Sequence, residues 1–389
     1  MSFLVGAVTD SGRSPRIGLV LPGGGARAAY EAGVIQALVE LWPGGGGSRI
    51  DVVTGTSAGA LNAVYLASRT ADLERGAHDL AALWSTLTAD RVYRRQPLEF
   101  WHRFGSSRWW PSRWDRNPPL RQGRAHALFD TGPLRELITR EVAWDELNRV
   151  IGAGLLRGVA VTTTSYTDNR NVTFYQASPE VESWTRVRRV GMPVALEPDH
   201  VMASIALPIL FPSVRINGCD YGDGSLLQLT PLAPAVHLGA ERLLIIAVHG
   251  PTRIRARPLP ASTPPSWAAI AGFMLDALFL DSLYTDLERL KRINESIASS
   301  MLIPDLPLRV VETLILSPSI DPTLLVSRHR DRFSRWLRWL VRDSEDGVSP
   351  GFELESYLFF DGCYCRNLVE LGYSDTLSRK DEIRKFLTG

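Results

Sequence analysis

The pentapeptide Gly55-Thr56-Ser57-Ala58-Gly59 places a serine between a short apolar run and a stretch of small residues. A serine hydroxyl can attack a carbonyl carbon when it stands on a tight strand-to-helix turn, and such a turn needs small neighbours because a larger side chain would clash. Gly55 and Gly59 meet this requirement. The pattern predicts that Ser57 is the nucleophile of an acyl transfer; the alternative is an ordinary glycine-lined turn in a parallel sheet.

A glycine loop, Gly23-Gly24-Gly25-Ala26-Arg27, follows an earlier apolar run. Glycines leave backbone N–H groups uncovered, and the start of a helix favours negative charge. The loop can therefore hold a phosphate or the oxyanion of a tetrahedral intermediate.

The phosphate alternative has a motif behind it, because Gly23, Gly25 and Ala28 fit the G-x-G-x-x-G/A pattern of dinucleotide sites. In those sites a carboxylate stands at the end of the second strand. Here Asp51 stands at the start of that strand and Ser57 at its end. An oxyanion hole beside the nucleophile is the favoured interpretation, and nucleotide binding is kept as an alternative function.

Two residues are candidates for the base that takes the serine proton. Asp223-Gly224 follows an apolar stretch and a short predicted hairpin, although Asp-Gly is also a common turn signal. His249 follows a buried run, and the order Ser57, Asp223, His249 is that of α/β-hydrolases. The early position of Ser57, before several strands have been laid down, counts against such a triad.

The elements expected around these residues are two strand-and-helix units in series, which imply a parallel sheet with a right-handed crossover. Both the glycine loop and Ser57 then project from the carboxyl edge of that sheet. Further runs predict a hairpin and a strand buried on both faces. The expected strands are 16–22, 50–56 and 242–248, the helices 26–40 and 57–68, and the hairpin turn 167–170.

Taken together, GGGAR, GTSAG, the A-x-x-x-L-P-x-L-F-P run at 203–212 and Asp223-Gly224 resemble the patatin-like phospholipase family in content, order and spacing. The resemblance implies a three-layer α/β/α sandwich with a mainly parallel central sheet and helical additions at the C-terminus. It also implies hydrolysis of acyl esters of lipids, with Ser57 as nucleophile, Asp223 as sole base, and Gly24, Gly25 and Ala26 as oxyanion donors. The sequence departs from the family at two positions. At Ala28 the family usually has glycine, and at Ser225 it often has glycine or alanine.

The domain organisation expected from this resemblance is a catalytic domain at 16–250 that follows a tail at 1–15. A proline-rich linker or loop at 251–266 leads to a mostly helical region at 267–389, which we expect to pack on the catalytic domain.

Composition narrows the function classes. The 389 residues carry 43 basic and 42 acidic side chains, a net charge of +1, which argues against a generally basic nucleic-acid binder. Three cysteines without C-x-x-C spacing indicate neither a disulfide framework nor a zinc site, and the expected chemistry requires no metal or other cofactor. The N-terminus lacks the features of a signal peptide, and the apolar stretch 267–280 is interrupted by Asp276, which suits a buried or interfacial helix. We expect a cytoplasmic protein.

Residues 91–124 form an insertion, here called the Arg/Trp segment, with nine arginines against two acidic residues and four tryptophans. This mixture suits docking on anionic lipid, but it also suits nucleic-acid binding or a solvated loop folded onto the domain. A second basic stretch, 328–342, has arginines on one helical face, as an interfacial helix does. For a lipid hydrolase, the two stretches favour peripheral membrane contact, and a catalytically idle lipid-binding module is the remaining alternative.

Overall fold

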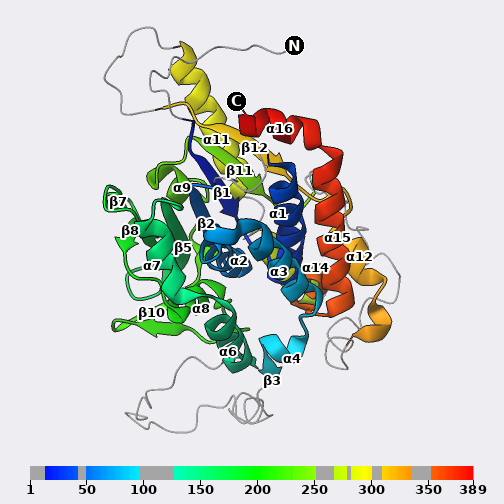
Figure 1. Ribbon diagram of the computed structural model, residues 1–389. Helices are drawn as coiled ribbons and strands as arrows, with labels where there is room; N and C mark the ends of the chain where they lie inside the picture. The colour runs from blue at the N-terminus through cyan, green and yellow to red at the C-terminus, as the bar shows by residue number, and fades with distance from the viewer. Residues whose placement is uncertain are drawn as a thin grey trace, which may run out of the picture.

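A single large sheet organises the described residues of the computed structural model, which are 14–42, 50–95, 127–228, 230–250, 267–277, 282–299, 309–333 and 352–388 (Figure 1). Ten strands run in the order β12-β11-β1-β2-β5-β6-β8-β7, with β10 pairing to β5 and β9 to β10. Neighbours from β12 to β5 are parallel. The strands are β1 (Ile17–Leu21), β2 (Val52–Thr56), β5 (Gly158–Ser165), β6 (Arg170–Ala177), β7 (Trp184–Arg186), β8 (Arg189–Pro193), β9 (Val214–Ile216), β10 (Cys219–Asp223), β11 (Arg242–Ile246) and β12 (Glu312–Leu316).

Alternate residues of the central strands point to opposite faces, because successive side chains of a strand do so. Leu19, Leu21 and Val53 belong to the larger core cluster, whereas Val20 and Val52 belong to the smaller one. Helices cover both faces of the sheet, and for this reason the sequences of its central strands are continuous apolar runs. The predicted α/β/α sandwich is confirmed.

The larger core lies under most of the helices. Helices α1 and α2, which follow β1 and β2 as the sequence predicts, contribute to this core together with helices from later in the chain. These are α1 (Ala29–Leu41), α2 (Ala58–Ala67), α3 (Leu73–Ser85), α4 (Ala89–Val92), α6 (Gly132–Glu141), α7 (Trp144–Gly152), α8 (Pro198–Ile205), α12 (Pro322–Ser327), α14 (Phe352–Leu358), α15 (Gly362–Ser378) and α16 (Lys380–Thr388).

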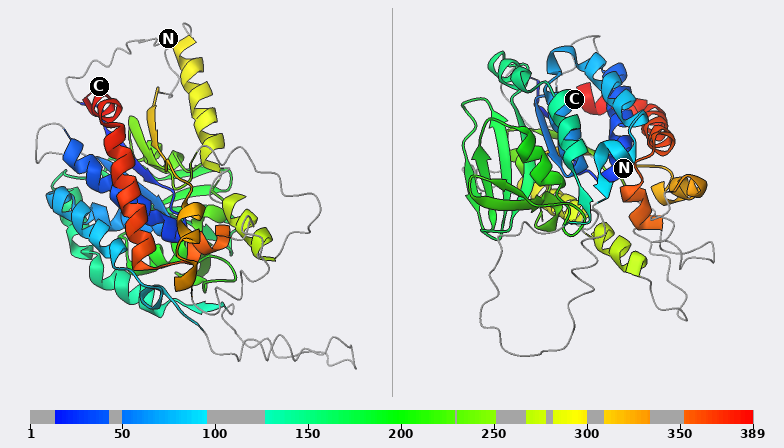
Figure 2. Two further views of the ribbon diagram at one scale, coloured as in Figure 1. Left: turned by 90° about the vertical axis from the view of Figure 1, so that its right-hand side faces the viewer. Right: turned by 90° about the horizontal axis from the view of Figure 1, so that it is seen from below.

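The opposite face is covered by α9 (Ala233–His237) and α11 (Ser282–Ser299), and Leu238 and Leu283 from these segments belong to the smaller core. In Figure 2, left, the yellow α11 stands on the far side of the strands from the red α15. Helix α10 (Trp267–Asp276) packs against α14 and leaves Phe273 70% and Met274 60% exposed. It is therefore a surface helix with an apolar exposed face.

The C-terminal region is joined to the first half of the chain at several places. Strand β12 extends the sheet beside β11, and α15 lies along α1 (Figure 1). The two helices approach closely because Gly33 faces the backbone of Val369 and Gly372 faces that of Tyr30, where a Cβ would overlap main-chain atoms.

The predicted hairpin at 167–170 is formed by β5 and β6, and the predicted strand at 242–248 is β11. A second short hairpin, β9 with β10, ends at Asp223. A two-residue ladder pairs β3 (Arg94–Arg95) with β4 (Phe129–Asp130). Most of the Arg/Trp segment, the linker at 251–266 and most of the second basic stretch lie outside the described residues.

Candidate active site

Ser57 stands on the turn between β2 and α2, with a backbone φ of 54° and ψ of −131°. This conformation is costly for a residue with a side chain, so the surroundings must hold it. The Ser57 N–H donates to Ser204 Oγ at 2.9 Å, and the Ser204 hydroxyl donates to the Thr162 carbonyl at 2.6 Å. A buried hydroxyl from α8 thus ties the strained turn to the sheet.

The glycines of the turn allow it to pack directly on the glycine loop. A Cβ on Gly59 would overlap the Leu21 carbonyl, and one on Gly23 would overlap the Thr56 carbonyl. A Cβ on Gly55 would meet the backbone of Gly59. Only glycine therefore fits at these positions, and the loop after β1 lies against the turn after β2, as expected for neighbouring parallel strands.

Asp223 also lies beside this turn, at the end of a strand that runs in the direction opposite to β2. One edge of strand β5 pairs with β6. Its other edge pairs with β2 along the first part of the strand and with β10 along the last part. Thr56, the last residue of β2, pairs with Thr162, and Asp223, the last residue of β10, pairs with Thr163. The two strands therefore meet end to end, which brings Asp223 beside Ser57.

The Asp223 carboxyl is completely buried. Its Oδ1 accepts the Ser225 N–H at 2.9 Å, and its Oδ2 has no hydrogen-bond partner among the described residues. Burial raises the pKa of Asp223 from 3.8 to about 6, while the Ser225 amide and the nearby Ser57 hydroxyl lower it. A carboxyl in this state can accept a proton near neutral pH.

The glycine loop has a left-handed backbone throughout, with φ values of 78° at Gly23, 142° at Gly24 and 58° at Gly25. A short 3₁₀ turn, η1 (Gly25–Ala28), then leads into α1. The Gly23 N–H donates to Glu31 Oε1 at 2.9 Å. Within the described part of the chain the Gly24 and Gly25 amides have no acceptor, which leaves them available to an anion.

Arg27 and His249 belong to a different cluster. The fully buried Arg27 guanidinium donates to Ser356 Oγ at 2.7 Å, contacts His249 Nδ1 at 2.6 Å and lies 3.9 Å from the Tyr357 ring centroid. His249 Nε2 is 3.2 Å from the Tyr357 hydroxyl. Both ring nitrogens of His249 thus face Arg27 and α14, and no contact with Asp223 or Ser57 is seen in the described residues.

A narrow apolar pocket of about 30 Å³ begins at Ser57 and Gly25. It is lined by residues of α2, α3, α4, α6, α8 and α14 and of the segments that follow α3, α8 and α14. Its lining residues are Gly25, Ser57, Ala58, Leu61, Trp84, Leu87, Val92, Leu134, Ile205, Leu207, Phe211, Tyr357, Leu358 and Phe360.

Sequence reasoning missed several residues of this site. Glu31 and Asn62 are buried polar side chains in otherwise apolar helical stretches, and that isolation was the signal that could have found them. Ser204 lies within the 203–212 run without being singled out. The pocket residues Tyr357 and Phe360 carry no local signal, because they reach the site only through the long-range packing of α14 on η1.

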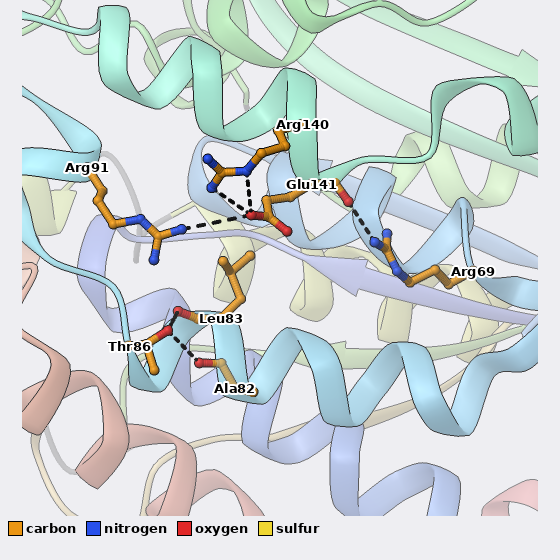
Figure 3. Close-up of polar contacts among 7 residues, drawn as sticks. All are labelled: Arg69, Ala82, Leu83, Thr86, Arg91, Arg140 and Glu141. Carbon is orange, nitrogen blue, oxygen red and sulfur yellow. Dashed lines mark hydrogen bonds and ion pairs between the residues drawn. The ribbon is translucent and has the colours of Figure 1, made fainter.

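The Arg/Trp segment is described only at its N-terminal end, residues 91–95. The guanidinium of Arg91, near the end of α4, lies 3.8 Å from Glu141 Oε1, and the guanidinium of Arg140 donates to the same oxygen at 2.8 Å (Figure 3). Arg69 donates to the Glu141 carbonyl at 2.7 Å. The first arginine of the segment is therefore engaged with α6.

Comparison with known proteins identifies the family. The model of the patatin-like phospholipase family matches residues 19–236, whereas a search of curated proteins found no match. Among solved structures the chain is similar to VipD from Legionella pneumophila, with 13% identity and a TM-score of 0.36 over 95% of this chain and 67% of that one. None of the described helices is both long and apolar enough to cross a bilayer. Because the family match spans more than half of the chain and includes the glycine loop, Ser57 and Asp223, the protein belongs to the patatin-like phospholipase family of lipid acyl hydrolases.

Proposed function

We propose that the protein is a serine acyl-hydrolase that cleaves acyl esters of lipids through Ser57 and Asp223 and an acyl-enzyme intermediate. Ser57 Oγ attacks the ester carbonyl carbon while its proton passes to Asp223, and the alcohol leaves with a proton returned from Asp223. Water then attacks the acyl-enzyme, with Asp223 again as base, and releases the fatty acid and free Ser57.

The meeting of β2 and β10 along one edge of β5 is the observation that carries this proposal. It puts a serine on a strained turn beside a buried carboxyl, and both positions are set by main-chain pairing. A nucleophile and its base need this proximity, and a preorganised pair avoids the cost of assembling it during the reaction. His249 is not part of this dyad, because it faces Arg27 and Tyr357.

The oxyanion that forms on the carbonyl oxygen would be held by the amides of Gly24, Gly25 and Ala26. Gly25 lines the pocket together with Ser57, and its left-handed backbone turns the start of η1 toward this space. Amides fixed before the reaction stabilise the developing negative charge more than mobile water does.

The lining of the apolar pocket suits the acyl chain of a lipid, and its volume of about 30 Å³ admits the part of that chain next to the ester carbonyl. It begins at Ser57, and every other lining residue is apolar or small except for the Tyr357 hydroxyl and the Trp84 indole N–H. An acyl chain in it would be removed from water, at roughly 0.8 kcal/mol per methylene. This lining also disfavours the nucleotide-binding alternative, since a nucleotide would bring charge and polar groups into the same space.

Labelling with a fluorophosphonate, with the modified residue located by mass spectrometry, tests the nucleophile. We expect the label on Ser57, and we expect Ser57→Ala and Asp223→Asn each to abolish ester hydrolysis while the protein stays folded. The double variant should be no worse than either single one, because the two groups act as a unit.

Asp220→Asn is a matched control, because Asp220 lies on β10 but its side chain is 46% exposed. It should keep full activity. Normal turnover by folded Ser57→Ala would refute the mechanism. Liposome binding without any esterase activity in the parent protein would instead favour the idle lipid-binding module.

A further inference from the structure

A chain of buried hydrogen bonds connects the glycine loop with the wall of the apolar pocket. Gly23 N–H donates to Glu31 Oε1 at 2.9 Å, and Asn62 Nδ2 donates to Glu31 Oε2 at 2.8 Å. The indole N–H of Trp84, which lines the pocket, donates to Asn62 Oδ1 at 2.7 Å. Glu31, Asn62 and Trp84 are at most 2% exposed.

The direction of every hydrogen bond in this chain is determined by the indole. Trp84 can only donate, so Asn62 must present its oxygen to Trp84 and its amide group to Glu31. Asn62 Nδ2 also donates to the Ala28 carbonyl at 3.1 Å, which agrees with this orientation. Glu31 therefore accepts with both oxygens, and these two hydrogen bonds favour its carboxylate form against the opposing effect of burial.

A carboxyl at this position is costly. Glu31 has no cationic partner among the described residues, and burial raises the pKa of Glu31 from 4.5 to about 8, against the lowering effect of the Asn62 and Gly23 hydrogen bonds. An apolar residue of similar size would avoid the desolvation cost of a buried charged group. Packing alone thus does not account for a glutamate here.

The Gly23 amide that Glu31 holds adjoins the two amides offered to the oxyanion. Gly23, Gly24 and Gly25 all have left-handed backbone, and glycine is the residue type with the most conformational freedom. Three such residues in series need an external anchor to keep their N–H groups aimed at one point. Glu31 is the side chain that provides this anchor in the described structure.

We propose that Glu31 is the positioning residue of the oxyanion loop, and that Asn62 and Trp84 connect its orientation to the wall of the acyl pocket. This inference deepens the proposed hydrolase function and depends on it. Gly23 then serves as the anchored end of the loop, and the oxyanion is held by the amides that follow it.

A polarity swap tests this role while hardly changing the shape of any side chain. Glu31→Gln turns one acceptor into a donor that faces the Asn62 amide, and Asn62→Asp places two carboxyls against each other. The double variant restores one donor against one acceptor between positions 31 and 62, and the carboxylate introduced at position 62 still accepts from Trp84, while the Ala28 carbonyl loses the donor it has in the parent. We expect each single variant to lower kcat by about 10- to 100-fold with little change in KM, as misaimed oxyanion donors do. The double variant should recover to within roughly fivefold of the parent protein.

Amide hydrogen exchange gives a second readout that does not depend on turnover. Exchange at residues 23–25 should accelerate in each single variant and slow again in the double variant. Glu40→Gln, on an exposed part of α1, is the matched control and should change neither readout.

The proposal is overturned if both single variants keep the parent's kcat and exchange rates, or if the double variant is no better than the worse single one. If a single variant fails to fold, recovery of folding in the double variant supports the coupled polarity, and failure of both contradicts it. A parent protein without any hydrolysis would refute the proposed function, while the exchange pattern would still decide the role of Glu31 in holding the loop.

Discussion

Asp223 is the residue whose surroundings most directly affect the chemistry. In the proposed mechanism it must be ionised to accept the Ser57 proton, yet burial opposes its ionisation. A pKa of about 6 keeps the carboxylate dominant at neutral pH while making it a stronger base than an exposed aspartate. The kcat/KM of the parent enzyme should therefore fall as the pH drops through about 6, which a pH profile with a soluble ester would measure.

The same burial affects stability, and its sign follows from the raised pKa. The contribution of Asp223 to the free energy of unfolding is fully present below about pH 3.8 and is lost as the pH rises through about 6. The loss is on the order of 3 kcal/mol. Asp223→Asn should thus be more stable than the parent at pH 8, with the difference closing toward pH 4 in urea unfolding. Asp220→Asn should show no such trend, and equal stability of Asp223→Asn and the parent at pH 8 would contradict a desolvation cost at this carboxylate.

The site residues that belong to a sequence motif could be predicted from the sequence, and those outside any motif could not. Ser57 and the glycine loop can be recognised in the sequence because their backbone geometry requires small neighbouring residues. Glu31 and Ser204 lie outside any such motif and act on it from elsewhere in the chain, Ser204 binding a turn 147 residues away. A pattern within a few residues cannot contain that information.

Among the elements, the helix α14 both contacts the glycine loop and lines the pocket. Gly25 has no room for a Cβ beside the Tyr357 carbonyl, so the loop and α14 are in direct contact. Phe360, just after this helix, lines the pocket with its ring centroid 6.4 Å from that of Trp84. These rings limit the depth of the pocket.

Phe360→Leu should deepen the pocket and shift the preferred acyl chain of the ester substrate to a greater length. The expected change is a several-fold rise in kcat/KM for longer chains relative to shorter ones, since each further buried methylene contributes roughly 0.8 kcal/mol. A series of p-nitrophenyl esters measures this. Phe359→Leu is the matched control, because Phe359 packs on Phe333 and Tyr364 and does not line the pocket. An unchanged chain-length profile in Phe360→Leu would rule out this limit.

Strands and helices close to the motifs were predictable because their apolar periodicity is strong. β1, β2, α2, β11 and the β5–β6 hairpin all lie where the sequence indicates them. The order of strands was not predictable, because it depends on which distant segments pair. In particular, no local pattern indicates that β10 continues the edge of β5 where β2 ends.

For the molecule as a whole, the described residues on either side of 96–126, a range that includes most of the Arg/Trp segment, lie at or beside the pocket. Val92 lines it, the Tyr93 and Phe129 rings are 4.5 Å apart, and the Leu128 N–H donates to the Ile209 carbonyl at 2.9 Å. Ile209 is 74% exposed and has a left-handed backbone with φ of 69°. The exposed Ile209 therefore lies beside the place where the described chain resumes after the Arg/Trp segment.

Replacing Arg108, Arg113 and Arg116 by glutamine should weaken binding to anionic liposomes on the order of 100-fold at low salt. Each arginine near the surface contributes on the order of 1 kcal/mol, and salt screens the effect. Hydrolysis of a small soluble ester should stay unchanged. Sedimentation with liposomes over a salt series measures this, with glutamine at the exposed Arg75, Arg149 and Arg384 as the control of equal charge. Equal liposome binding by the triple variant and the parent would exclude docking through this segment.

The shared edge of β5 also determines which changes of chain length the protein can tolerate. Main-chain pairing holds Thr162 against β2 and Thr163 against β10, and this pairing does not require threonine. A change of the Thr162 or Thr163 side chain therefore leaves in place the main-chain pairing that holds Ser57 beside Asp223. A one-residue insertion or deletion between these pairs is different, because it would displace one strand end by about 3.3 Å and turn the following side chains to the other face. The position of Ser57 relative to Asp223 thus depends on the length of this strand more than on the side chains of Thr162 and Thr163.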